Sequence, residues 1–239
     1  MKQLKVFISG ADRGLGLSLT EKLLKRGHLV YAGQFMPDWP ALDQLKLTFP
    51  ESLQIIPLDV GCDENVKEAA CKIKELSDRI DVLICNAGII GWDDELVEGP
   101  TDTKMMLDVY NVNAVGSVRL VEQCLPLLMN GDERKICFVS SEAGSVSNCE
   151  RDSFFWYGMS KSAMNLYAKT MFNRLRPQNF KFRLYDPGWM KTYMHGELNE
   201  RATYTPEEAA TFAVDYFFDQ TVEEDELVLH IYDGRTSAF

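Results

Sequence analysis

Short apolar segments alternate along this chain with longer segments whose apolar residues recur every three or four positions. The first pattern is typical of buried parallel strands and the second of amphipathic helices. We predict seven strands, at residues 5–9, 29–32, 53–58, 81–85, 135–139, 180–185 and 227–232. Between them we predict helices at residues 17–26, 63–76, 103–129, 153–174 and 206–218, and a short helix within 37–50.

This alternation predicts an α/β fold with a doubly wound, mostly parallel, seven-stranded sheet that is covered by helices on both faces. No linker, low-complexity tract or repeat interrupts it, so we expect a single domain over residues 1–239. The long helix at 103–129 contains Pro126, where we expect a bend. In such sheets ligands bind beyond the carboxyl ends of the strands, so residues that directly follow strands are the first candidates for a site.

Composition excludes several classes of function. The formal net charge of −11 disfavours nucleic acid or an anionic membrane surface as the main partner. We see no signal peptide and no apolar stretch long enough to span a bilayer, so we expect a cytoplasmic location. The six cysteines are scattered, which indicates reduced thiols, and the three histidines form no metal-ligand pattern. We therefore expect no metal site.

A glycine-rich turn lies between the first predicted strand and the first predicted helix. It reads Gly10-Ala-Asp12-Arg13-Gly14-Leu15-Gly16. Glycine allows positive φ and lets a phosphate approach the backbone, and the start of a helix offers unpaired N–H groups to an anion. The spacing GxxxGxG differs from the GxGxxG of the usual dinucleotide-binding turn. A plain strand-to-helix connection is the alternative interpretation.

Tyr157 and Lys161 stand four residues apart, which on a helix places both side chains on one face. A free phenol has a pKa of about 10. A nearby ammonium favours the phenolate and lowers that pKa, so the pair can exchange a proton with a carbonyl or alcohol oxygen. The same spacing is common on solvated helix faces, and the pair alone therefore decides nothing.

Taken together, these segments resemble the short-chain dehydrogenase/reductase family, and the resemblance covers essentially the full chain. The matches, in the order of the family's motifs, are the glycine turn, Asp59-Val60, Asn86-Ala87-Gly88, Asn113, Ser140-Ser141, Tyr157 with Lys161, and Pro187-Gly188 with Thr192. The resemblance is to the classical type, and the long segment between Ser141 and Tyr157 is similar to the subgroup of C-factor and sniffer-type carbonyl reductases. It implies a Rossmann-type domain with a short substrate lid around 189–204.

The resemblance also implies catalytic roles. It makes Tyr157 the general acid/base and Lys161 the group that lowers its pKa and binds the nicotinamide ribose. Ser141 resembles the hydroxyl that polarises the substrate carbonyl, and Asn113 the residue whose helix distortion holds a water in a proton relay to the lysine.

The segment between the fifth predicted strand and the tyrosine is longer than in many family members. The register of the catalytic serine therefore stays open, with Ser140 and Ser145 as the alternatives to Ser141.

A nicotinamide dinucleotide is the cofactor that the resemblance implies. The residues expected to bind it are Gly10, Asp12, Arg13, Gly14, Leu15, Gly16, Asp59, Val60, Asn86, Ala87, Gly88, Tyr157, Lys161, Pro187, Gly188 and Thr192. The second predicted strand leads to Phe35 rather than to the acidic residue that favours NAD. Arg13 stands where NADP-using members often carry a basic residue, and a guanidinium suits a 2′-phosphate. We expect NADP, with NAD as the alternative.

We therefore hypothesise an NAD(P)-dependent oxidoreductase that interconverts a small-molecule carbonyl and an alcohol. By resemblance, the two long helices pair between subunits in a homodimer or homotetramer. Candidate apolar residues for a substrate pocket, or equally for core or interface, are Trp92, Phe154, Phe155, Trp156, Trp189, Met190, Tyr193 and Met194.

Two other classes of function are alternatives. A non-catalytic dinucleotide-binding regulator or scaffold would use the same fold, because fold does not fix function. A serine hydrolase is suggested by Gly158-Met-Ser160-Lys-Ser162, which approaches the GxSxG pattern but lacks the last glycine and falls within a predicted helix.

Overall fold

The computed structural model of the chain describes residues 2–91, 100–194 and 196–239. The strands are β1 (Lys5–Ile8), β2 (Leu29–Gln34), β3 (Leu53–Pro57), β4 (Val82–Cys85), β5 (Lys135–Val139), β6 (Lys181–Asp186), β7 (Leu229–Ile231) and β8 (Thr236–Ser237). The α-helices are α1 (Gly14–Lys25), α2 (Ala41–Thr48), α3 (Asp63–Leu76), α4 (Thr103–Tyr110), α5 (Gly116–Met129), α6 (Phe155–Leu175) and α7 (Pro206–Phe218). Short turns of other helical types are η1 (Asn111–Val115), η2 (Glu142–Gly144) and η3 (Arg176–Gln178).

All the strands form one sheet in the order β3-β2-β1-β4-β5-β6-β7-β8. Every neighbouring pair is parallel except β7 and β8. The prediction of a mostly parallel, doubly wound α/β sheet is confirmed, but the sheet has eight strands instead of seven. The eighth strand has only two residues, Thr236 and Ser237, which are too few to form an apolar pattern that predicts a strand. It turns back onto β7 through Gly234, which has a φ of +86°.

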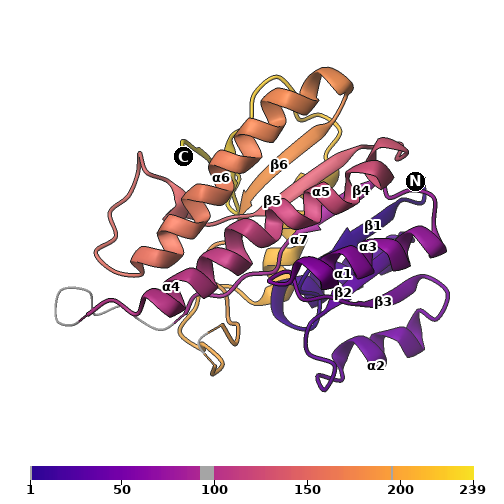
Figure 1. The fold of residues 1–239 in the computed structure, drawn as a ribbon, viewed down its shortest axis with the longest axis horizontal. Helices are drawn as coiled ribbons and strands as arrows, with labels where there is room; N and C mark the ends of the chain where they lie inside the picture. The colour runs from indigo at the N-terminus through magenta and orange to yellow at the C-terminus, as the bar shows by residue number, and fades with distance from the viewer. Residues whose placement is uncertain (1, 92–99, 195) are drawn as a thin grey trace.

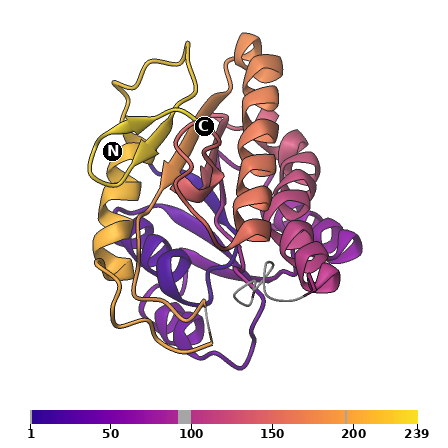
Figure 2. The same ribbon diagram turned by 90° about the vertical axis from the view of Figure 1, so that its left-hand side faces the viewer.

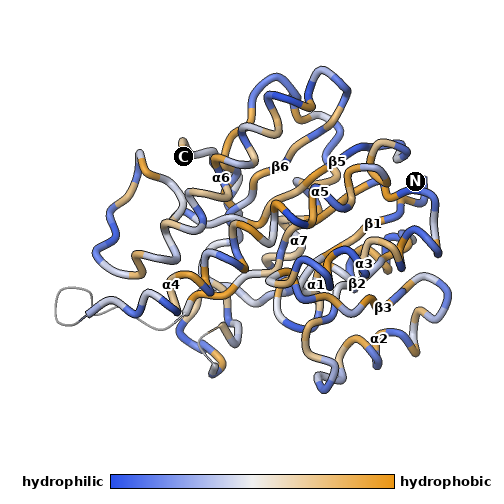
Figure 3. The backbone as a smooth tube through the Cα atoms, in the orientation of Figure 1, coloured by the Kyte–Doolittle hydropathy of each residue, from blue (hydrophilic) through white to orange (hydrophobic). Residues whose placement is uncertain are grey.

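Helices cover both faces of the sheet because successive strand residues point to opposite sides. Phe7 of β1 joins a core with α3, α5 and α6, whereas its neighbours Val6 and Ile8 join a second core with α1 and α7. Figure 2 shows α5 and α6 on one side of the sheet and α7 on the other. In Figure 3 the central strands are mostly apolar and the outer turns mostly polar.

The region predicted as one helix at 103–129 is continuous but irregular (Figure 1). Its irregularity is the π-helical turn η1 at Asn111–Val115, and α5 continues through Pro126, where a bend was expected. Such π-turns frequently mark functional sites, and this one contains Asn113.

Within the described residues, no helix has the length and apolar character to cross a bilayer. The same part of the chain contains no group of three His, Cys, Asp or Glu side chains that could hold a metal ion. All six cysteines are free thiols.

Candidate functional site

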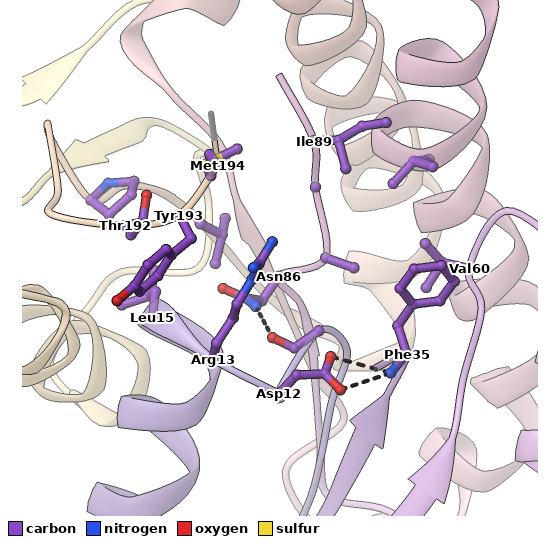
Figure 4. A pocket seen from close by; sticks show the side chains of 18 of the residues that line it. Asp12, Arg13, Leu15, Phe35, Val60, Asn86, Ile89, Thr192, Tyr193 and Met194 are labelled. Atoms are coloured by element: carbon purple, nitrogen blue, oxygen red, sulfur yellow. Dashed lines mark hydrogen bonds between the residues drawn. The ribbon is translucent and has the colours of Figure 1, made fainter. Parts of the chain in front are cut away.

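A cleft of about 400 Å³ opens at the carboxyl ends of the central strands (Figure 4). Ligands bind at this edge in doubly wound sheets. The predicted site residues that line it are Gly10, Asp12, Arg13, Gly14, Leu15, Gly16, Asp59, Val60, Asn86, Ala87, Gly88, Tyr157, Lys161, Pro187 and Thr192. Asn113, Ser141 and Gly188 do not line it. Residues spread over most of the chain thus meet in one place.

The glycine turn leads from β1 into α1 and requires its glycines. Gly10 and Gly14 have φ angles of +64° and +56°, which residues with side chains rarely adopt. A Cβ atom on Gly16 would lie 2.1 Å from the carbonyl oxygen of Gly10, so no larger residue fits there. No side chain caps the start of α1, and its first N–H groups are therefore available to an anion.

Asn86 ties this turn to the end of β4. Its side-chain amide donates to the carbonyl oxygens of Ser9 and Gly10 at 2.9 and 3.0 Å. The Ser9 hydroxyl in turn accepts from the backbone N–H groups of Asn86 and Ala87, each at 3.0 Å. These bonds fix the spacing between the ends of β1 and β4, on which the floor of the cleft depends.

Asp12 orders the turn that follows β2. Its Oδ1 atom accepts from the backbone N–H groups of Phe35 and Met36, both at 2.9 Å. Figure 4 shows the Asp12 carboxylate bonded to the N–H of Phe35. Phe35 itself is 62% exposed and occupies the place where an acidic side chain would contact an adenosine ribose. Asp59 similarly stabilises its own turn after β3, because it accepts from the N–H of Gly61 at 2.8 Å.

Asn113 is fully buried in η1, and its side chain reaches the segment that follows β4. Its amide accepts from the N–H of Ile89 and donates to the carbonyl of Ile89, both at 2.8 Å. It also donates to the hydroxyl of Ser160 on α6 at 2.9 Å. Asn113 thus joins α4–α5, α6 and the segment containing Gly88, and it lies behind the cleft wall.

Substitution of Asn113 by alanine is expected to lower the free energy of unfolding by roughly 3 kcal/mol, from three hydrogen bonds at about 1 kcal/mol each. The loss leaves the part-buried backbone N–H and C=O groups of Ile89 without their side-chain partner. Denaturant unfolding followed by circular dichroism measures the change. Asn130, an exposed residue on the same helical run with one bond to Asp78, is the control: its alanine variant loses at most about 1 kcal/mol. Equal stability of the two variants would contradict this account.

Tyr157 and Lys161 lie together on α6, as their spacing predicts. The Lys161 ammonium lies 5.7 Å from the centroid of the Tyr157 ring. It donates to the carbonyl oxygen of Val139, the last residue of β5, at 2.9 Å. Lys161 is only 3% exposed, so its charge is held at the inner end of the cleft.

Burial sets the titration of both groups. Burial lowers the pKa of the Lys161 ammonium to about 8, and the Asp186 carboxylate acts in the opposite direction. Burial also raises the pKa of the Tyr157 phenol, which a side-chain hydrogen bond with Ser141 lowers in part. Burial therefore outweighs the lowering effects on the phenol pKa in this arrangement, and the role expected of Lys161, to favour the phenolate, stays a prediction. At neutral pH the lysine carries its charge and the phenol its proton.

Ser141 is the serine whose hydroxyl meets the phenol. It also donates to Glu142 Oε2 at 2.6 Å, while Arg151 from the long segment before α6 donates to the other oxygen of Glu142 at 2.9 Å. Of the two alternative serines, Ser140 lines the cleft, but its hydroxyl binds Asn165 at 2.6 Å. The Ser145 hydroxyl binds the carbonyl of Ala238 at 2.7 Å.

Asp186, the last residue of β6, was not predicted as a site residue. It is 5% exposed, and it accepts from the N–H of Gly188 at 3.0 Å. Burial raises the pKa of this carboxyl to about 6, so it is mostly ionised at neutral pH. Its position directly before Pro187-Gly188, at the end of an apolar strand, was the available signal. Gly188, with a φ of +73°, packs on the ring of Tyr232.

Other lining residues that the sequence reasoning missed are Phe35, Met36, Leu58, Ile89, Val112 and Val139. Most of them stand within a few residues of a strand end, which is the signal that could have identified them.

Among the proposed pocket aromatics and methionines, Met190, Tyr193 and Met194 line the cleft. Trp156 is buried and Trp189 is 56% exposed, whereas Trp92 lies outside the described residues. Phe154 and Phe155 lie at the start of α6 and do not line the cleft.

Ser160, the serine of the GxSxG-like segment, is buried inside α6. Its hydroxyl donates to the carbonyl of Tyr157 at 2.7 Å and accepts from Asn113. A nucleophile elbow requires an exposed serine on a strand-to-helix turn, so the hydrolase alternative does not fit this geometry.

The sequence is similar to those of known proteins. The family model described as short chain dehydrogenase matches residues 4–203. An uncharacterized oxidoreductase of Schizosaccharomyces pombe is 32% identical over 208 residues, which cover 86% of this chain and 81% of the relative.

Solved structures agree with the observed architecture. The crystal structure of NADPH-bound carbonyl reductase from chicken fatty liver is 25% identical, has a TM-score of 0.88 and covers 100% of both chains. The carbonyl reductase Sniffer of D. melanogaster, at 24% identity, covers 100% of both chains with a TM-score of 0.90 and so shares the fold.

Proposed function

The chain belongs to the short-chain dehydrogenase/reductase family of NAD(P)-dependent oxidoreductases, classical type, and on that premise we propose that it interconverts a carbonyl and an alcohol by hydride transfer. The observation that carries the proposal is the single cleft that joins the glycine turn to Tyr157 and Lys161. One end of this cleft suits the phosphates of a dinucleotide, and the other end suits proton transfer.

The residues of the cleft fit a nicotinamide dinucleotide. Gly16 admits no Cβ atom, and the uncapped start of α1 offers N–H groups to phosphate. Asp59 and Val60 line the part of the cleft after β3, where the adenine would lie, and Asn86 to Gly88 line the part after β4. When bound, a reduced nicotinamide supplies the hydride. All other steps belong to side chains of this protein.

Tyr157 is the proposed proton donor in the direction of carbonyl reduction. Burial keeps its phenol protonated at neutral pH, which is the form that a donor needs. Proton loss leaves a phenolate, and the Lys161 ammonium at 5.7 Å from the ring stabilises that negative charge. Ser141, bonded to the same phenol, is the proposed second contact of the carbonyl oxygen.

Asn113 is proposed to support this relay from behind. Its side chain fixes the backbone of Ile89 and the hydroxyl of Ser160, both of which adjoin the cleft wall. The π-turn that contains Asn113 is the kind of helix distortion that could hold a water on the way to Lys161. A Cβ atom added to Gly88 would lie 3.2 Å from Asn113 Oδ1 and 3.6 Å from Lys161 Nζ, so the two polar groups approach one another at this glycine.

NADP is the proposed preferred form of the cofactor. Arg13 lines the cleft beside the glycine turn and provides a positive charge for a 2′-phosphate. Phe35, which directly follows β2, offers no carboxylate to the ribose hydroxyls. The chicken carbonyl reductase of similar fold binds NADPH, which supports the same assignment.

The segment around residues 189–204 is the proposed substrate lid. Its members Met190, Tyr193 and Met194 line the cleft with apolar surface, so the proposed substrate is a small or flat carbonyl compound. We also propose that residues 1–239 form a single dinucleotide-binding domain, which includes this lid.

Pairing of subunits through α6 is also proposed. This helix is apolar on more than one side, and its Leu166 and Met159 remain 67% and 56% exposed in the single chain. Exposed apolar side chains on one long helix suit a homodimer or homotetramer interface.

Oxidation of NADPH in the presence of a panel of aldehydes and ketones tests the proposed function. We expect turnover with part of the panel and a kcat/KM at least about tenfold higher with NADPH than with NADH, because a single well-made phosphate contact contributes about 1.4 kcal/mol or more. Tight NADPH binding without turnover of any compound would instead favour the regulator or scaffold. Failure to bind either dinucleotide would refute both.

A further inference from the structure

Arg13 is held by two aromatic rings from distant parts of the chain. Its guanidinium carbon lies 5.4 Å from the ring centroid of Trp39 and 5.9 Å from that of Tyr193. The two rings also contact one another, with centroids 5.6 Å apart and an angle of 65° between their planes. In Figure 4 the Tyr193 ring lies beside Arg13 at the mouth of the cleft. Trp39 precedes α2, and Tyr193 lies on the segment after β6.

This kind of contact leaves the guanidinium free to bind an anion. A carboxylate would neutralise its charge and occupy its N–H groups, whereas an aromatic ring attracts the charge and uses no N–H donor. Within the described part of the chain, Arg13 is held by rings and by no carboxylate. An arginine whose position is fixed and whose N–H groups have no other acceptor can bind two oxygens of a phosphate at a small cost in conformational entropy.

The turn that carries Trp39 is itself anchored to the glycine turn. Asp12 binds the N–H groups of Phe35 and Met36, and the N–H of Trp39 donates to the carbonyl of Met36 at 3.0 Å. The adjacent residues Asp12 and Arg13 therefore contact the same loop, one through its backbone and the other through its indole. Together, these two attachments fix the position of Trp39 relative to Arg13.

We propose that Trp39 and Tyr193 are specificity-determining positioning residues, which hold the Arg13 guanidinium at the cleft and so create the preference for a 2′-phosphorylated adenosine. The proposal rests on the proposed function, since it concerns the same dinucleotide site. Trp39 does not line the cleft and acts through Arg13. Tyr193 does line it, and it links recognition of the adenosine phosphate to the segment that carries Met190 and Thr192.

Binding of two adenosine nucleotides, measured by isothermal titration calorimetry, tests this without catalysis. The probes are adenosine 2′,5′-bisphosphate and adenosine 5′-monophosphate, which differ only in the 2′-phosphate. We expect the wild type to prefer the bisphosphate by on the order of 100-fold. Trp39→Ala is expected to reduce that ratio about tenfold, through lost ring contact and a less ordered arginine, with little change for the monophosphate. Tyr193→Ala is expected to reduce it in the same sense.

Two further variants separate positioning from general damage. Trp39→Phe retains a ring and is expected to keep the ratio within about threefold of the wild type. In an Arg13→Ala background the effect of Trp39→Ala on the ratio is expected to vanish, because Trp39 acts only through that guanidinium. Equal weakening of both probes by Trp39→Ala, or the same change of ratio with and without Arg13, would overturn the proposal.

The outcome is independent of the proposed reaction. If the wild type reduces carbonyls with NADPH but Trp39→Ala leaves the probe ratio unchanged, the positioning role fails and the proposed function stands. If the ratio follows the expected pattern but no carbonyl is reduced, the positioning role stands and the proposed function fails. A wild type with no preference for the bisphosphate would refute the positioning role directly.

Discussion

Replacement of Tyr157 by phenylalanine is expected to lower kcat/KM for carbonyl reduction by about 10²- to 10⁴-fold, the range for loss of a general acid or base. The change removes the proton that the carbonyl oxygen receives but keeps the ring on which Lys161 packs. Affinity for NADPH is therefore expected to stay nearly unchanged. Steady-state kinetics and a fluorescence titration with NADPH measure the two quantities on the same preparation.

Tyr167 provides a matched control on the same helix. Its hydroxyl is buried and has no hydrogen-bond partner among the described residues. Tyr167→Phe is expected to keep wild-type activity and to leave stability equal or slightly higher, because an unsatisfied polar group is removed. Full turnover by the Tyr157 variant, or equal losses in both variants, would remove Tyr157 from the proposed mechanism.

Replacement of Lys161 by methionine is expected to lower kcat/KM by at least about 100-fold, since no ammonium remains to stabilise the phenolate. Methionine fills a similar volume without a buried charge, so the melting temperature is expected to stay the same or rise. Lys169→Met, on the same helix but outside the cleft, is the control and is expected to keep full activity. A lower melting temperature with retained activity would indicate a purely structural lysine.

The same lysine predicts a pH dependence for the wild type. Its pKa is lowered from 10.5 to about 8, so the ammonium loses its proton as pH rises through about 8. The phenol keeps its proton in that range because its pKa is raised, and the expected fall of kcat/KM for reduction near pH 8 belongs to Lys161. Between pH values of about 8 and 10.5, Lys161 binds more protons in the unfolded chain than in the folded one. The contribution of Lys161 to the free energy of unfolding therefore rises with pH in this range. Deprotonation of Lys161 does not destabilise the fold, so unfolding does not explain the expected fall of kcat/KM near pH 8. A kcat/KM that stays constant through this pH range would contradict the proposed role of the Lys161 ammonium.

The architecture was largely predictable because each central strand is a short apolar run that stops at a polar or glycine residue. β5 at Lys135–Val139 and α3 at Asp63–Leu76 have the predicted limits. The π-turn at Asn111–Val115 has no signal in the apolar periodicity, and the bonds of Asn113 to Ile89 and Ser160 join segments that lie far apart in the sequence. β8 was not predicted because a strand of two residues has no periodicity.

Site residues next to strand ends were predictable, because the topology of the sheet brings those ends together. Contacts between distant loops were not. Arg151 reaches Glu142 beside Ser141 only because the long segment before α6 folds back, and no spacing rule predicts that pairing. The elevated pKa of Tyr157 likewise depends on burial, which the helical spacing of Tyr157 and Lys161 could not reveal.

A crystal structure of the complex with NADP⁺ tests the central claim most directly, because that claim joins the glycine turn and the tyrosine–lysine pair in one dinucleotide site. We predict phosphate at the start of α1, and the nicotinamide end within hydrogen-bonding reach, about 3 Å, of the Tyr157 hydroxyl and the Lys161 ammonium. A nicotinamide bound away from α6, with Lys161 still bonded only to the carbonyl of Val139, would contradict the account.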